Sequence, residues 1–86
     1  MKEVQIKNRK IEIVSTIDAA GLYCPMPIVH LKRELEKLKS NQVVEILADD
    51  PSFEKDITSW CQASSDKLLS VSKNEDDIYV AYVEKF

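Results

Sequence analysis

Alternation of apolar and polar residues marks the first patterned segment of the chain. Residues 10–17 read KIEIVSTI, and this alternation, rich in Ile and Val, predicts a β-strand. The preceding VQIKNRK contains Val4 and Ile6, two positions apart. This segment either pairs back as a short strand through a turn near Asn8 and Arg9 or stays a frayed end.

A helical period replaces the alternation after residue 24. The segment from Pro25 to Lys39 predicts an amphipathic helix, because its apolar residues recur at spacings of three and four. The apolar stripe consists of Ile28, Leu31, Leu35 and Leu38, and the opposite side carries Lys32, Arg33, Glu36 and Lys39. Residues 42–48 (QVVEILA) then form a short apolar run that is typical of a buried strand.

The second half of the chain alternates helix and strand again. Asp50 and Pro51 indicate a helix start, because an aspartate can accept hydrogen bonds from the free amides and proline suits the first helical position. One face of this helix collects Phe53, Ile57, Trp60, Cys61 and Ser64. Residues 67–73 and 77–83 predict two strands joined by the polar turn NEDD, which favours a β-hairpin.

This order of elements, βαβαββ, predicts an α+β fold. The first two strands are expected to be parallel with a right-handed crossover, and the closing pair antiparallel. The result is a two-layer α/β sandwich with a mixed four-stranded sheet and two helices on one face, which leaves the other face less covered. At 86 residues the chain is expected to form a single domain, 1–86, with residues 1–9 an extension of uncertain structure.

Composition and charge narrow the possible functions. The net charge of −3 argues against nucleic-acid binding by phosphate neutralisation. The apolar runs are too short for a membrane span and the start lacks the apolar region of a secretory signal, so a cytoplasmic protein is expected. The two cysteines are then expected to be free thiols. Cys24, Cys61 and the single His30 do not supply a zinc site, and neither a metal nor a cofactor is predicted.

The segment GLYCPMP, residues 21–27, surrounds a thiol with the residues of a turn and a helix start. Cys24 is expected at or beside the N-cap, with Pro25 first and Pro27 third in the helix, where their missing N–H groups cost little. Gly21 gives the chain freedom to turn from strand into helix. A thiol at a helix N-terminus has its thiolate favoured, here modestly, with the Met26 amide as the main donor. The Met26 side chain is expected to form an apolar rim beside the thiol.

Each of these residues also has a purely structural interpretation. Cys24 could pack as a small buried hydrophobe, and core packing is the better interpretation of Cys61. Asp49 and Asp50 resemble a catalytic carboxylate pair, but their place before a proline favours helix capping. His30 is expected to be a solvated surface residue rather than the base of a Cys–His pair. A redox role would need a bond between the two cysteines, with their Cα atoms within about 7 Å.

The combined spacing of these residues resembles the TusA/SirA-like family of small sulfur-carrier proteins. The resemblance rests on Asp18-x-x-Gly21-Leu22-x-Cys24-Pro25-x-Pro27, the amphipathic helix after it, Ala48-Asp49-Asp50-Pro51 and the cysteine at position 61. It covers about residues 11–84 and implies the βαβαββ sandwich. Tyr23 and Met26 stand where TusA proper usually carries Arg and Glu, so the pathway, including tRNA thiolation, stays open.

The resemblance also implies a function. In this family the cysteine of the CPxP motif, here Cys24, receives sulfane sulfur as a persulfide and relays it to another protein. It implies a cysteine desulfurase or rhodanese-like donor and a downstream acceptor protein. The chain would act as a sulfur-relay carrier, sulfurtransferase-like, rather than as a stand-alone enzyme. The alternative is a regulatory protein-interaction module without sulfur chemistry.

Overall fold

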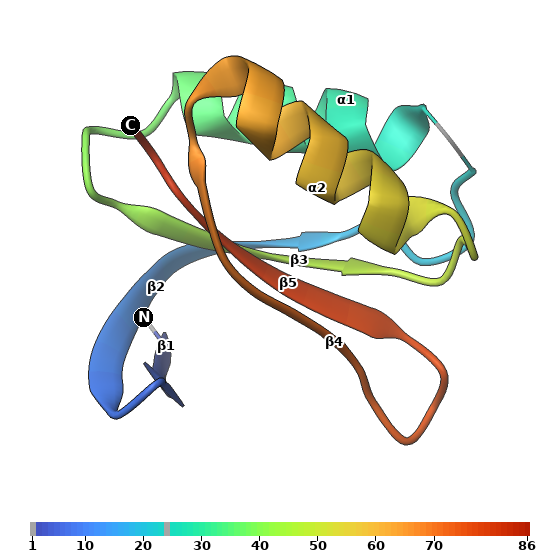
Figure 1. Ribbon diagram of the computed structural model, residues 1–86, viewed down its shortest axis with the longest axis horizontal. Helices are drawn as coiled ribbons and strands as arrows, with labels where there is room; N and C mark the ends of the chain where they lie inside the picture. The colour runs from blue at the N-terminus through green and yellow to red at the C-terminus, as the bar shows by residue number, and fades with distance from the viewer. Residues whose placement is uncertain (1, 24) are drawn as a thin grey trace.

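The computed structural model describes residues 2–23 and 25–86, which form five strands and two helices (Figure 1). In chain order these are β1 (Lys2–Ile6), β2 (Arg9–Asp18), α1 (Met26–Glu36), β3 (Val43–Ala48), α2 (Phe53–Ser64), β4 (Lys67–Lys73) and β5 (Tyr79–Glu84). Each element predicted from the sequence is present. Among the described residues, no helix is long and apolar enough to cross a membrane.

The strands form one mixed sheet in the order β1-β2-β3-β5-β4. β2 and β3 are parallel, whereas the other neighbouring pairs are antiparallel. Both helices lie on the same face of this sheet (Figure 1), so the predicted two-layer α+β architecture is confirmed.

The predicted count of four strands is wrong, because the N-terminal extension adds a fifth. β1 pairs with β2 through a two-residue turn in which Lys7 and Asn8 both have positive φ, 50° and 66°. Such a turn matches the twist of the two strands that it joins. Val4 and Ile6 pack against a buried apolar cluster, which explains why these residues are not a frayed end.

Irregular pairing in two strands divides the apolar residues between two clusters. The pairing of β2 with β3 shifts register between Ile13 and Ser15. Such a bulge reverses which face alternate side chains point to. Ile13 therefore packs on the face opposite the helices, whereas Ile17 packs under them. A similar shift in β4 sends Leu69 to the face opposite the helices.

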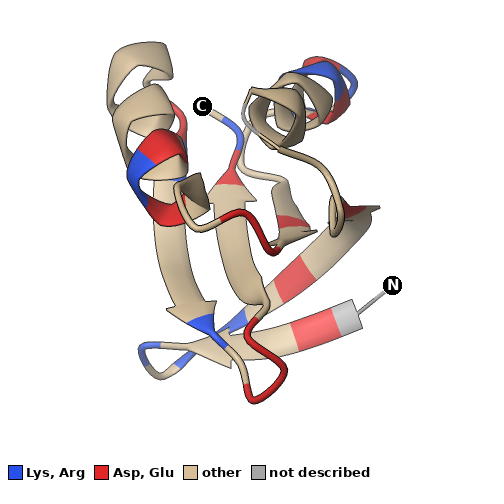
Figure 2. Ribbon diagram, turned by 90° about the vertical axis from the view of Figure 1, so that its right-hand side faces the viewer, with Lys and Arg blue, Asp and Glu red and all other residues tan. Residues whose placement is uncertain are grey.

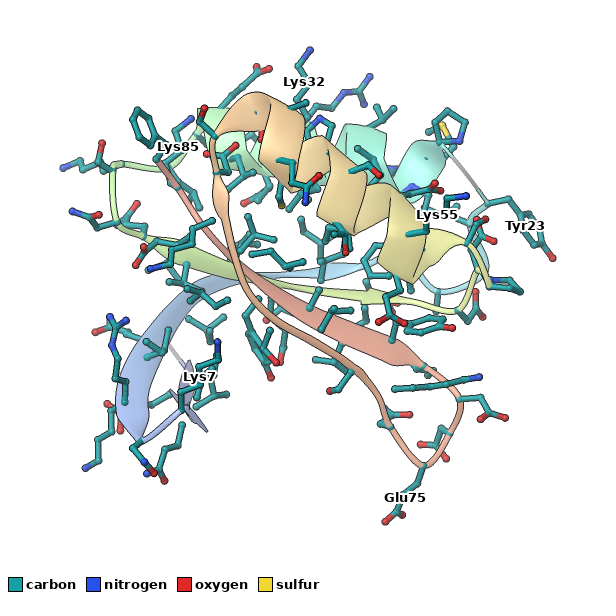
Figure 3. The ribbon with its side chains drawn as sticks, in the orientation of Figure 1. Lys7, Tyr23, Lys32, Lys55, Glu75 and Lys85 are labelled. Atoms are coloured by element: carbon teal, nitrogen blue, oxygen red, sulfur yellow. The ribbon has the colours of Figure 1, made fainter. Side chains whose placement is uncertain are left out.

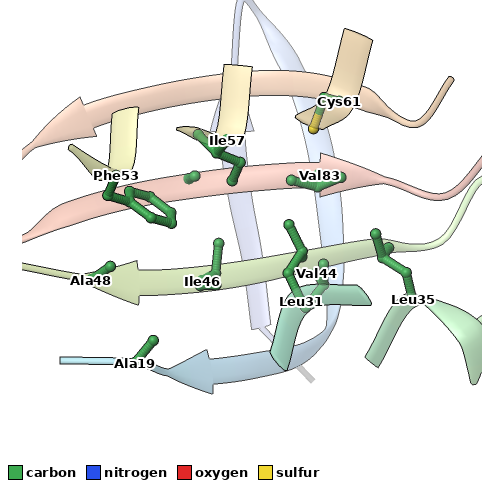
Figure 4. Packing of buried hydrophobic residues seen from close by; sticks show 11 residues of the cluster. Ala19, Leu31, Leu35, Val44, Ile46, Ala48, Phe53, Ile57, Cys61 and Val83 are labelled. Carbon is green, nitrogen blue, oxygen red and sulfur yellow. The ribbon is translucent and has the colours of Figure 1, made fainter. Parts of the chain in front are cut away.

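The larger cluster lies between the sheet and the two helices (Figure 4). Its buried members are Ala19, Leu31, Leu35, Val44, Ile46, Ala48, Phe53, Ile57, Cys61, Ala81 and Val83. The smaller cluster buries Ile11 and Ile13 of the β1–β2 hairpin together with Val43 and Leu69, and this hairpin curls away from the helices (Figure 1). The hairpin therefore covers part of the sheet face that was predicted to be less covered.

A buried carboxylate lies on the same face as the smaller cluster. Glu45, in the middle of β3, is 2% exposed. Its oxygens accept hydrogen bonds from the hydroxyls of Tyr82 (2.8 Å) and Thr16 (3.2 Å). Burial, together with this contact, raises the pKa of Tyr82 to about 12. The hydrogen bonds compensate for removing the carboxylate from water.

Candidate functional site

Two loops meet at one edge of the sheet, where β2 and β3 end. Because these strands are parallel, the helix that follows each of them begins at this same edge (Figure 1). The Ala19 amide donates to the Leu47 carbonyl (2.7 Å), and the Gly21 amide donates to Asp49 Oδ1 (2.9 Å). These bonds tie the loop before α1 to the end of β3 and the loop before α2.

Gly21 lets the first loop turn from strand to helix. Its φ of +84° lies in the left-handed region, and a Cβ built on it meets no atom within 4 Å. Backbone conformation rather than space therefore requires glycine here. Two further bonds shape the turn, since the Ala20 amide donates to Asp18 Oδ1 (3.1 Å) and the Leu22 amide to the Ala19 carbonyl (3.2 Å).

The start of α1 lies one residue later than the sequence predicted. Pro25 is the N-cap, Met26 is the first helical residue, and Pro27 is the second and buried. The Met26 amide donates to the Tyr23 carbonyl (2.9 Å), so this N–H is engaged by the backbone. The predicted contact of this amide with the Cys24 thiol lies outside the described residues. Because prolines have no N–H, the other amide of this first turn belongs to Ile28.

Cys24 itself lies outside the described residues, but its neighbours in sequence are described. Tyr23 is 72% exposed and Met26 is 41% exposed. Tyr23 projects at this edge of the molecule (Figure 3). Met26 is thus exposed, as a rim residue would be, and Tyr23 adds an exposed aromatic side chain, but the predicted rim beside the thiol involves a residue outside the described ones. Sequence reasoning missed Tyr23 as a rim residue, although an aromatic side chain beside a thiol in a loop was a signal for it.

The predicted capping of α2 by Asp49 and Asp50 is wrong, because α2 has no side-chain cap and Asp49 accepts its hydrogen bond from the Gly21 amide of the other loop. Asp50 is 6% exposed, and its Oδ1 accepts hydrogen bonds from the Ser52 amide (3.2 Å) and hydroxyl (3.1 Å). The Phe53 amide donates to the Asp50 carbonyl (2.9 Å). Pro51 therefore lies in a turn, and α2 begins at Phe53 with Ser52 as its N-cap instead of at Pro51.

Acidic side chains dominate the charge of this loop. Figure 2 shows Asp49 and Asp50 as the red segment that leads into α2. The first turn of α1, in contrast, contains no acidic residue. Among the described residues, no three His, Cys, Asp or Glu side chains group so that they could hold a metal ion.

Cys61 belongs to the core and lies away from this edge. It is 5% exposed, and burial, with a smaller effect of Asp66, raises the pKa of its thiol to about 11. Phe53, at the start of α2, stacks near Tyr79 beside the edge, and Cys61 follows about 12 Å further along the helix. Figure 4 shows Cys61 beside Val83, remote from Ala48 at the end of β3. The core interpretation of Cys61 is confirmed.

His30 does not join the site edge either. It lies in the middle of α1 and is half-buried.

Comparisons with known proteins agree with this architecture. A family model described as sulfurtransferase TusA matches residues 15–85. A protein of Aquifex aeolicus is 41% identical over 70 residues, covering 81% of this chain and 35% of that protein. One of Bacillus subtilis is 38% identical over 69 residues, covering 80% and 91%. Both bear the name "putative sulfur carrier protein".

A solved structure is similar in fold. The crystal structure of a SirA-like protein from Desulfitobacterium hafniense superposes with a TM-score of 0.75 at 21% identity, covering 83% of this chain and 96% of that one.

Proposed function

The chain belongs to the TusA family, and on this premise we propose that it is a sulfur carrier that accepts sulfane sulfur on Cys24 and passes it to a partner protein. The observation that carries the proposal is the pair of exposed side chains, Tyr23 and Met26, on either side of Cys24 in the sequence. A relay residue must meet two different proteins in turn, so it needs an open edge rather than a deep pocket.

The transfer proceeds by two thiol exchanges of the same kind. The Cys24 thiolate attacks the terminal sulfur of a persulfide on the donor, the donor's S–S bond breaks, and the donor cysteine leaves as a thiolate. Cys24 then carries the persulfide. The acceptor's cysteine thiolate attacks its terminal sulfur, and Cys24 leaves as a thiolate. No net oxidation or reduction occurs, so the relay needs no redox cofactor.

The start of α1 suits this chemistry electrostatically. The partial positive charge of a helix N-terminus favours an anion, and the first turn of α1 has no carboxylate that would compete. The effect of the dipole on the pKa of an exposed thiol is below about one unit. The carrier thiol is therefore expected to be only modestly activated.

The proposed partners are proteins that hold a persulfide or a nucleophilic thiol. A cysteine desulfurase or a rhodanese-like protein fits the role of donor, because each forms a persulfide on its own cysteine. The acceptor is a downstream protein that presents a thiol. The apolar surface of Tyr23 and Met26 provides contact area for both.

Intact-mass spectrometry after incubation with a cysteine desulfurase and cysteine tests the proposal. The wild-type chain and the Cys61→Ala variant should gain the mass of one sulfur atom, whereas Cys24→Ala should not. A dithiol reductant should remove the added mass. Loading of Cys24→Ala would refute the assignment. So would failure to load from either a desulfurase or a rhodanese while iodoacetamide still alkylates Cys24.

A further inference from the structure

A small cavity lies on the face of the sheet opposite the helices, away from the proposed carrier site. It has a volume of about 100 Å³ and opens between the β1–β2 hairpin and the start of β4. Its lining consists of Ile6, Lys7, Arg9 and Ile11 from the hairpin and Lys67, Leu68 and Leu69 from β4. Figure 3 labels Lys7 on this hairpin, below the sheet.

The charged residues that line this cavity all have the same sign. Lys7, Arg9 and Lys67 are cations and exposed, in a chain whose net charge is −3. Within the described part of the chain, the ion pairs join Lys37 to Glu34 and Lys73 to Asp77, and none involves the three lining cations. The three cations repel one another, and an anion bound between them would relieve that repulsion.

The inner lining of the cavity is apolar. Ile11 and Leu69 are buried members of the smaller cluster, and Ile6 packs against them. A cavity of about 150 Å³ lined by apolar side chains can hold a benzene molecule. In proportion, about 100 Å³ accommodates roughly four carbon atoms. Four of the five chain carbons of hexanoate would therefore fit inside, with the carboxylate at the cationic rim.

From these observations we infer that this cavity binds a short aliphatic carboxylate, whose chain contacts Ile6, Ile11 and Leu69 and whose carboxylate meets Lys7, Arg9 and Lys67. The hairpin residues of the cavity precede residue 15, where the match to the family model begins. The inference therefore does not rest on the proposed sulfur relay, and Cys24→Ala should bind the carboxylate as the wild type does.

Titration of the ¹⁵N-labelled full chain with hexanoate tests the inference by NMR. Saturable shifts are expected in the amides of residues 6–11 and 67–69, with a Kd in the millimolar range for so small a ligand. Acetate, which lacks the chain, and hexan-1-ol, which lacks the charge, should each bind at least about threefold more weakly. Absence of saturable shifts at these amides, or equal binding of hexan-1-ol, would overturn the inference.

Charge variants locate the site. Arg9→Gln and Lys67→Gln should each weaken hexanoate binding about two- to fivefold, as expected for exposed charge pairs. Lys10→Gln is the matched control, because it removes the same charge from the same hairpin without lining the cavity. Equal weakening by Lys10→Gln would mean nonspecific attraction and would refute the site. Each variant's amide spectrum in the absence of ligand verifies that the hairpin remains folded.

Discussion

The two helices of this fold start at the same edge of the sheet, but their starts are built differently. α2 follows Asp50, whose carboxylate accepts hydrogen bonds from Ser52, and its first turn contains Glu54 and Asp56. Neither helix has a side-chain cap, but the first turn of α1, which follows Pro25, contains no acidic residue.

The difference separates a structural helix start from one suited to chemistry. Carboxylates near the start of α2 accept a hydrogen bond from a backbone amide and interact favourably with the positive end of the helix dipole, so they stabilise the fold. At α1 the two prolines reduce the number of free amides without adding charge. On the proposed function, the positive end of that helix favours the thiolate of Cys24. Changes at α2 should lower stability, whereas changes at α1 should alter thiol reactivity.

The largest expected effect is a difference in reactivity between the two cysteines. At pH 7.5 iodoacetamide should alkylate Cys24 at least about 100-fold faster than Cys61. The pKa of Cys61 is raised to about 11, so its thiolate is scarce, and the side chain is buried. Peptide mass spectrometry of a time course measures both rates. Comparable rates in the folded protein would contradict the contrast between the helix start and the core.

The raised pKa of Cys61 also predicts a pH dependence of stability. Folding favours the thiol form, so this contribution is fully present below pH 9, the ordinary pKa, and is lost as the pH rises through about 11. Cys61→Ala should lose less stability than the wild type over that range. Urea unfolding at pH 8, 9, 10 and 11 measures the difference, and parallel curves for both proteins would contradict it.

Asp50→Ala should destabilise the protein by about 2 kcal/mol. The substitution removes the acceptor for the Ser52 amide and hydroxyl at a buried position. Urea unfolding monitored by circular dichroism gives the free energy of unfolding. Asp76→Ala, in the exposed loop between β4 and β5, is the control and should change that free energy by less than about 0.5 kcal/mol. An equal loss in both variants would show that net charge, not the hydrogen bonds between Asp50 and Ser52, is responsible.

Much of this fold could be predicted because its signals are local. Apolar residues at spacings of three and four predicted α1, and the short apolar run predicted β3. The strand predicted at residues 67–73 has the same bounds as β4. The bulge in β2 could not be predicted in this way. Ile11, Ile13 and Ile17 alternate regularly in sequence, yet the register shift sends the first two to one face and the third to the other.

The site was predicted less completely than the fold. Hydrogen-bond partners decide where a helix begins, and the sequence does not reveal them. The Met26 amide bonds to the Tyr23 carbonyl, and Asp50 closes a turn before Phe53, so α1 begins one residue, and α2 two residues, later than predicted. Glu45 was also missed. A single carboxylate in an apolar run was the signal, but its partners Thr16 and Tyr82 come from other strands.

Gly21→Ala should cost about 1 kcal/mol of stability. An L side chain is strained at φ +84°, even though no atom would clash with its Cβ. Gly21→Asn should cost less, because asparagine tolerates the left-handed region. Chemical denaturation of both variants measures this order. If alanine is no worse than asparagine, backbone conformation is not the reason for glycine at this position.

The smallest effect is expected from placing at α1 the kind of charge that α2 already carries. Met26→Glu introduces an acid into the first turn of α1, where it repels the Cys24 thiolate and competes for the same helix end. The pKa of Cys24 should rise by less than about one unit, and the persulfide-loading rate at neutral pH should fall accordingly. The pH dependence of iodoacetamide alkylation measures the shift.

Met26→Gln controls for side-chain shape, and Gln62→Glu, exposed on α2, controls for net charge. An equal shift from Gln62→Glu would mean that the thiol responds to the whole protein's charge rather than to the start of α1.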